Sequence, residues 1–233
     1  MMEGIDHFCS GNNCIFCRIT TTEQIKIHTS HLATINEQLP SRDNSIESRM
    51  LYSQGEAGTE QSGESEQLEK LAFYDQLTGL TNVYVFFREL RLEVARAHRY
   101  KRPLTILALR LDNFEDIKAK YGPLGRELVL KHIGKLLLSL LRESDLASRL
   151  PDDQFAIILP ETNEAGAKLV AERIRHSLAK KPVKVNSLVL EITPSIGLAT
   201  CPKHGQESDT LLESCFTAQA EALNSGGNRV HAL

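Results

Sequence analysis

The chain has 233 residues, of which 41% are hydrophobic and 24% charged, and its formal net charge is −3. These are ordinary values for a globular protein, so they exclude wholesale disorder, and the net charge offers no general attraction to a nucleic-acid backbone or an anionic membrane surface. No apolar stretch approaches the roughly 20 residues that cross a bilayer, and the N-terminus lacks a secretory signal pattern. We therefore expect a cytoplasmic protein with no nucleic-acid partner and no membrane insertion.

The first part of the chain, residues 1–64, is predicted to be a flexible extension. Its later portion is rich in Ser, Gly, Glu and Gln and poor in clustered aliphatic residues, so it cannot bury enough surface to offset its ordering entropy. Cys9, Cys14 and Cys17 have the spacing Cys-x4-Cys-x2-Cys, which resembles half of a zinc site. The second half is not apparent, so free thiols in a mobile tail are the preferred interpretation and zinc binding is the alternative.

Residues 65–233 alternate between periodic apolar segments and turn signals, as one compact α/β domain does. Cys201 and Cys215 fall within it, and we expect them to have ordinary packing roles. The pattern predicts, in order, a helix over 82–100, a strand over 104–111, a helix over 125–141, a hairpin over 148–160 with its tip at 151–153, a helix over 163–180, a strand over 188–200, a helix over 207–223 and a closing edge at 226–230. Because of the hairpin, the sheet is predicted to be mixed rather than purely parallel.

A series of short motifs identifies a family. They are DQLTGLTNVYVF at 75–86, LDNF at 111–114, YG at 121–122, RESDLASRLPDDQF at 142–155, AERIR at 171–175, SIGLAT at 195–200 and NRV at 228–230. In this order and spacing they resemble the GGDEF family, whose active members condense two GTP molecules into cyclic di-GMP. The resemblance covers residues 70–233 and implies a GGDEF, nucleotidyl-cyclase-like fold with a mixed β-sheet flanked by helices.

The metal and signature positions that the resemblance implies have changed. Active members hold magnesium with an Asp at the position of Arg110, and a cation there repels the metal. The signature hairpin reads PDDQF at 151–155: Pro151 lacks the N–H that a glycine would offer to a phosphate, and Gln154 is not a carboxylate. Asp153 keeps a family metal position, but one ligand without its partner makes a poor Mg²⁺ site.

The substrate-binding positions implied by the family have changed as well. The guanine-reading Asn and Asp correspond to Lys118 and Glu127, and two phosphate-holding basic residues correspond to Leu223 and Gly227. Since phosphoryl transfer is catalysed mainly by positioning and charge stabilisation, we expect no diguanylate cyclase activity and no required cofactor.

A second ligand site of the family is retained. Its inhibitory Arg-x-x-Asp motif, which binds the product cyclic di-GMP, corresponds to Arg142 and Asp145, and a third contact corresponds to Arg173. Arginine can donate two parallel hydrogen bonds to the O6 and N7 atoms of guanine, and aspartate can accept from its N1 and N2 donors. The alternative is a solvated helix end with turn-forming residues.

These residues lead to a functional hypothesis in bacterial signal transduction. The chain is expected to be a cyclic di-GMP receptor that acts on an unidentified partner protein. The alternative is a nucleotide-independent interaction module built on the same fold. Because a helix that leads into a GGDEF domain often dimerises in the family, the segment 65–75 also suggests a homodimer.

Overall fold

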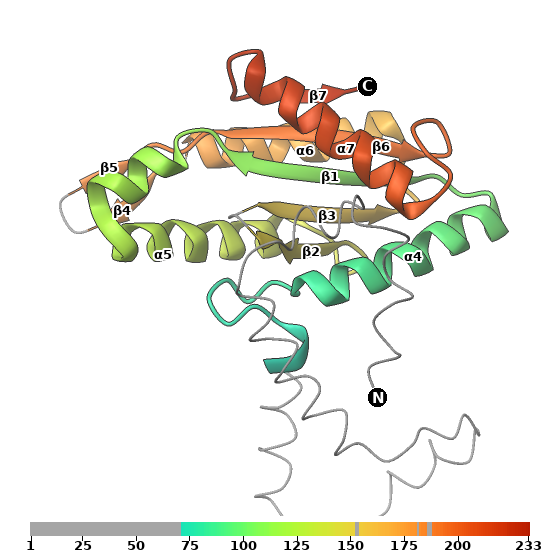
Figure 1. Ribbon diagram of the computed structural model, residues 1–233, viewed down its shortest axis with the longest axis horizontal. Coiled ribbons are helices and arrows are strands. Elements are labelled where there is room, and N and C mark those ends of the chain that lie inside the picture. Colours follow the sequence, from blue (N-terminus) through green and yellow to red (C-terminus); the bar gives the residue numbers. More distant parts are fainter. Residues whose placement is uncertain (1–70, 152–153, 181, 186–187) are drawn as a thin grey trace, which may run out of the picture. The chain divides into compact units, whose positions relative to one another are not determined.

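A computed structural model describes residues 71–151, 154–180, 182–185 and 188–233 (Figure 1). Phe73–Leu233 form one compact unit. The predicted extension 1–64, its three cysteines and most of the predicted helix at 65–75 lie outside the described residues, so they stay predictions. None of the described helices is long and apolar enough to cross a membrane.

A five-stranded mixed sheet forms the centre of this unit, with the order β2-β3-β1-β6-β7. Its strands are β1 (Leu104–Leu111), β2 (Leu146–Arg149), β3 (Phe155–Pro160), β6 (Pro194–Cys201) and β7 (Val230–Ala232). The central strand β1 is antiparallel to both β3 and β6, β2 is antiparallel to β3, and β7 runs parallel to β6. A separate antiparallel pair consists of β4 (Val183–Val185) and β5 (Leu188–Leu190).

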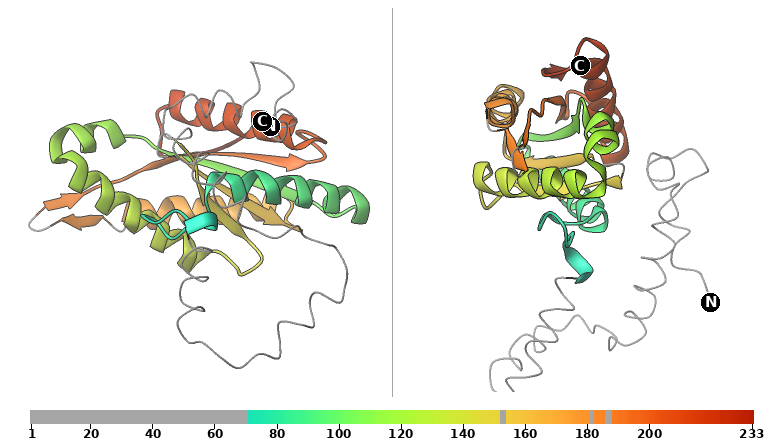
Figure 2. Two further views of the ribbon diagram at one scale, coloured as in Figure 1. Left: turned by 60° about the horizontal axis from the view of Figure 1, so that its bottom comes forward. Right: turned by 90° about the vertical axis from the view of Figure 1, so that its left-hand side faces the viewer.

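Helices cover both faces of the sheet (Figure 2). They are α4 (Val83–Tyr100), α5 (Phe114–Leu140), α6 (Glu164–Lys180) and α7 (Ser208–Asn224). Leu107, Leu109 and Leu111 of β1 belong to the main hydrophobic core with residues of α5 and α6. Side chains alternate along a strand, so the next residues face the other side, where the Cys215 Sγ atom of α7 donates to the Ile106 carbonyl oxygen. Burial from both sides explains why β1 reads as an almost continuous apolar run.

Local signals fix several element boundaries. Asn82 caps α4, since its Oδ1 atom accepts from the backbone N–H groups of Tyr84 and Val85. The segment before α4 is tied to β2: Asp75 accepts from the Thr78 hydroxyl at 2.7 Å and forms a partly buried ion pair with Arg149 at 3.1 Å. This segment therefore holds the end of β2 that lies nearest the hairpin tip.

The structure confirms the mixed sheet and most predicted elements, and it corrects two of them. The helix predicted over 125–141 is the second part of α5, and a helical part that begins at Phe114 precedes it across non-helical backbone at Gly122 (φ 64°, ψ −164°). The strand predicted over 188–200 is two strands in different sheets, β5 and β6, separated by residues 191–193. The short strand β4 and the helical segment before Gly122 were not predicted.

Candidate ligand site

The predicted ligand residues Arg142 and Asp145 lie on one turn between α5 and β2. The turn is closed in both directions: the Arg142 N–H donates to Asp145 Oδ2 at 3.0 Å, and the Asp145 N–H donates to the Arg142 carbonyl oxygen at 3.0 Å. Arg142 is exposed and Asp145 is half-buried. Among the described residues, the Arg142 guanidinium has no hydrogen-bond or ion-pair partner, so its donors face solvent.

The third predicted residue, Arg173, reaches this region from α6. Its Nη2 atom donates to the carbonyl oxygen of Leu140, the last residue of α5, at 2.6 Å. Helix ends leave carbonyl groups without intrahelical partners, and α5 has no basic residue of its own in its last turn. Arg173 supplies that missing donor, and its guanidinium thereby lies beside the start of the turn that carries Arg142.

The combined chemistry of these three side chains suits a guanine base attached to phosphate. The exposed Arg142 guanidinium can present two parallel donors, and the Asp145 carboxylate accepts only one hydrogen bond from the described residues. A guanidinium held by a backbone carbonyl, as Arg173 is, keeps further N–H donors for a phosphate or a base.

A pocket of about 450 Å³ reaches the same turn at Ser144. Its walls come from the second half of α4, the start of β1 and the end of β3. The lining includes acidic, basic and aromatic side chains: Glu93, Arg96, Tyr100, Arg102 and Glu161. Part of this charge is neutralised, because Arg96 pairs with Glu93 and Arg102 pairs with Glu161.

The pocket lies at the N-terminal end of β1, and the positions that the family uses for catalysis lie at the C-terminal end of this strand. Arg110 is the single exposed residue of that strand, opposite Ser195 of β6. The hairpin between β2 and β3 is closed by the Leu150 N–H, which donates to the Gln154 carbonyl oxygen at 2.8 Å. Asp152 and Asp153, at its tip, lie outside the described residues.

The predicted guanine-reading positions have ordinary surroundings. Lys118 is exposed and lies 3.5 Å from Glu115 on the same helix, an ion pair one turn apart, and Glu127 is exposed on α5. Leu223 is half-buried at the end of α7, while Gly227 is buried with a positive φ of 69°. The described part of the chain contains no cluster of three or more His, Cys, Asp or Glu side chains that could hold a metal ion.

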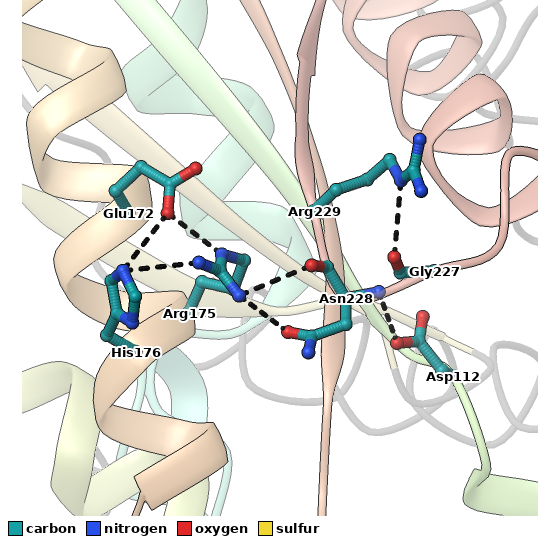
Figure 3. Close-up of polar contacts among 7 residues, drawn as sticks. All are labelled: Asp112, Glu172, Arg175, His176, Gly227, Asn228 and Arg229. Atoms are coloured by element: carbon teal, nitrogen blue, oxygen red, sulfur yellow. Dashed lines mark hydrogen bonds and ion pairs between the residues drawn. The ribbon is translucent and has the colours of Figure 1, made fainter.

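One residue that sequence reasoning did not single out, Asp112, is the centre of a hydrogen-bond network at the end of β1. Its carboxylate accepts from the Thr193 hydroxyl at 2.7 Å, the Ser195 hydroxyl at 2.5 Å and the Asn228 N–H at 2.8 Å. Figure 3 shows Asn228 between Asp112 and Arg175, whose Nη1 atom donates to Asn228 Oδ1 at 2.9 Å. The sequence did contain one indication of this role, an Asp directly after a buried strand. Its hydrogen-bond partners, however, are 81 to 116 positions away along the chain, so no local pattern reveals them.

Comparison with known proteins shows the family of this chain. Residues 72–229 match the family model described as "Diguanylate cyclase, GGDEF domain". Diguanylate cyclase A of Treponema denticola is 29% identical over 167 residues, which are 70% of this chain and 45% of that protein. Diguanylate cyclase DgcP of Pseudomonas aeruginosa is 34% identical over 160 residues, which are 68% of this chain and 24% of that protein. The chain thus spans less than half the length of these curated relatives.

A solved structure has the same fold. The GGDEF domain of DgcB from Caulobacter crescentus, in complex with c-di-GMP, is 25% identical with a TM-score of 0.65, and the match covers 69% of this chain and 93% of that one. The family model covers more than half of the sequence. The chain therefore belongs to the GGDEF domain family.

Proposed function

We propose that this chain is a GGDEF domain without cyclase activity that binds cyclic di-GMP through Arg142, Asp145 and Arg173 and signals to a partner protein in the cytoplasm. The observation that carries the proposal is the meeting of these three residues from two segments, through the hydrogen bond from Arg173 to Leu140 at the start of the Arg142 turn.

The rigid conformation of the turn at 142–145 supports ligand binding. Two hydrogen bonds close it on itself, so little backbone entropy remains to be lost when a ligand binds. The Arg142 side chain stays exposed, and a bidentate contact from arginine to guanine discriminates by about 1–3 kcal/mol. The DgcB domain of the same family binds c-di-GMP, which makes this the ligand to test first.

The loss of cyclase activity is supported by changes at separate requirements of the reaction. Arg110 stands where a metal-binding Asp is expected. At 4 Å and an effective dielectric of 20, two unit charges interact by about 4 kcal/mol, so the attraction of a carboxylate for the metal becomes a repulsion by the guanidinium. Pro151 and Gln154 remove a backbone donor and a carboxylate from the signature hairpin. The remaining carboxylate of this strand end, Asp112, is already engaged by three protein donors.

A second candidate function, a docking module that needs no nucleotide, has one observation in its favour. Both Asp145 and Arg173 stabilise the protein itself, one by closing the turn and the other by capping α5. The motif is therefore accounted for even without a ligand. Titration with cyclic di-GMP separates the two candidates.

The binding experiment is isothermal titration of the full chain with cyclic di-GMP in the absence of Mg²⁺. We expect saturable binding, and Arg142→Ala should weaken it by about 5- to 150-fold, the equivalent of 1–3 kcal/mol. Asp153→Ala is the matched control, because it removes a charged residue from the former catalytic hairpin. The absence of heat at tens of micromolar ligand would leave the docking module as the function.

The activity experiment incubates the chain with GTP and either Mg²⁺ or Mn²⁺ and separates the products by chromatography. We expect no cyclic di-GMP above a control without protein. Formation of cyclic di-GMP at a rate proportional to protein concentration would contradict the loss of activity.

A further inference from the structure

The side of α6 that faces away from the Arg142 turn carries a second anchored arginine, Arg175. Its Nε atom donates to Glu172 Oε2 at 2.8 Å, and its Nη1 atom donates to the Asn228 side chain at 2.9 Å and to the Asn228 carbonyl oxygen at 3.3 Å (Figure 3). The side chain of Arg175 is only 18% exposed. An arginine that is mostly buried and bonded at both edges of its guanidinium is fixed in one orientation.

The far end of this contact is itself fixed to the sheet. Asn228 has a left-handed backbone with φ of 45°, and its N–H donates to Asp112 Oδ2 at 2.8 Å. The next residue, Arg229, accepts from the Ile196 N–H of β6 at 2.9 Å, and the preceding Gly227 N–H donates to the Ala222 carbonyl oxygen at the end of α7. Arg175 therefore connects α6 to a turn that is bonded to β1, β6 and α7.

Two residues earlier on α6, Arg173 is bonded on the other side of the helix. Successive residues are rotated by about 100°, so positions 173 and 175 are about 200° apart around the axis. One arginine is bonded to the end of α5 and the other to the turn at Asn228. The two hydrogen-bonded contacts together set the rotation of α6 about its axis.

Packing constrains this rotation only in part. The buried stripe of α6 consists of Ala167, Ala171, Ile174 and Leu178; the last two interlock with the core, whereas the two alanines have no side chains long enough to do so. Side-chain heads lie about 5–6 Å from a helix axis, so a rotation of about 10° moves the head of Arg173 by about 1 Å. A displacement of that size exceeds the roughly 0.5 Å tolerance within which a binding group must be held.

We infer that Arg175 is a positioning residue for cyclic di-GMP: it does not touch the ligand, but through Asn228 it fixes the rotation of α6 that sets Arg173 at the Arg142 turn. This inference rests on the proposed function. It adds a residue on the opposite side of α6 to the determinants of affinity and makes the turn at 225–229 part of the binding apparatus.

The test is a double-mutant cycle by isothermal titration with cyclic di-GMP, with the full chain, its single variants Arg175→Gln and Arg173→Ala, and the double variant. We expect Arg175→Gln to weaken binding about 3- to 30-fold, within the range of measured couplings between neighbouring residues. In the Arg173→Ala background the same change should alter affinity less than twofold, because the residue through which it acts is gone. Arg175→Lys, which keeps a donor for Asn228, should recover part of the loss.

Two further variants keep the outcome interpretable. Arg88→Gln, on α4, removes a surface arginine that also pairs with a glutamate, and it should leave affinity unchanged. Asn228→Gly removes the side-chain acceptor of Arg175 while glycine tolerates the left-handed backbone, so it should reproduce the effect even where Arg175→Gln does not fold.

Different results overturn different statements. If the wild type binds and both Arg175→Gln and Asn228→Gly bind within twofold of it, the positioning role is wrong and the receptor function stands. An equal loss from Arg175→Gln with and without Arg173 would mean general loosening of the domain, which also overturns the inference. Absence of binding by the wild type overturns the receptor function and the inference with it.

Discussion

Replacing Asp112 with alanine should lower the stability of the domain substantially, although the residue is a single carboxylate at the end of a strand. The change removes three hydrogen bonds, from Thr193, Ser195 and Asn228. A typical hydrogen bond contributes about 1 kcal/mol, and one to a charged group about 1.5–3 kcal/mol, so the loss is at least about 3 kcal/mol. Ser195 is fully buried, which leaves its hydroxyl without water as a replacement.

For a domain of this size, 1 kcal/mol shifts the melting temperature by about 2–4 °C, so Asp112→Ala should lower Tm by about 6–12 °C. The assay is thermal unfolding followed by circular dichroism, with EDTA present in one series and Mg²⁺ in another. Asp116→Ala, which removes an exposed carboxylate from the nearby start of α5, is the control and should shift Tm by less than 2 °C. A shift as small as that for Asp112→Ala, or a wild-type Tm that rises sharply with Mg²⁺, would refute a purely structural role for this carboxylate.

Two other expectations concern the packing of α7 on β6. Gly197→Ala places a methyl group 2.2 Å from the Gln219 nitrogen and 2.3 Å from the Cys215 carbonyl oxygen, so the helix must shift, and urea unfolding should show a loss of about 1–3 kcal/mol; an unchanged midpoint would contradict the close approach. Burial raises the pKa of the Cys201 and Cys215 thiols, so little thiolate forms at pH 8. With the three N-terminal cysteines replaced by serine, labelling by a thiol reagent should therefore be slow until denaturant is added, and fast labelling of the folded chain would show that these sites open readily.

Much of the fold could be predicted because its main elements have clear periodicity. The strand over 104–111 was predicted with its observed bounds, since a short β-rich run between Pro103 and a polar segment has few other interpretations. The pattern correctly placed an interruption at Gly122, whose backbone is not helical, but it missed the helical part of α5 that precedes Gly122. Local patterns failed again at 191–193, where Glu191, Ile192 and Thr193 continue a strand-like alternation of polar and apolar residues although the chain passes from β5 to β6.

The candidate site was predictable only as far as motif spacing extends. Arg142 and Asp145 are three positions apart, so one turn brings them together, and their closure by two hydrogen bonds follows from that proximity. The bond from Arg173 to Leu140 depends on the packing of α6 beside α5, which no local pattern contains. The Asp112 network could not be predicted for the same reason, since its donors come from two further segments of the chain.

Gly227 has a consequence for the evolutionary history of the domain. The family places a phosphate-holding basic residue at this position, yet a Cβ atom on Gly227 would lie 2.8 Å from Asp112 Cγ, and the φ of 69° disfavours any side chain. The carboxylate cannot move aside without breaking its bonds to Thr193, Ser195 and Asn228. An arginine at this position would therefore destabilise the domain unless the turn changed its course as well. If the proposed loss of cyclase activity is correct, a return to activity requires the turn at Gly227 and the bonds of Asp112 to change together, and no single substitution can achieve it.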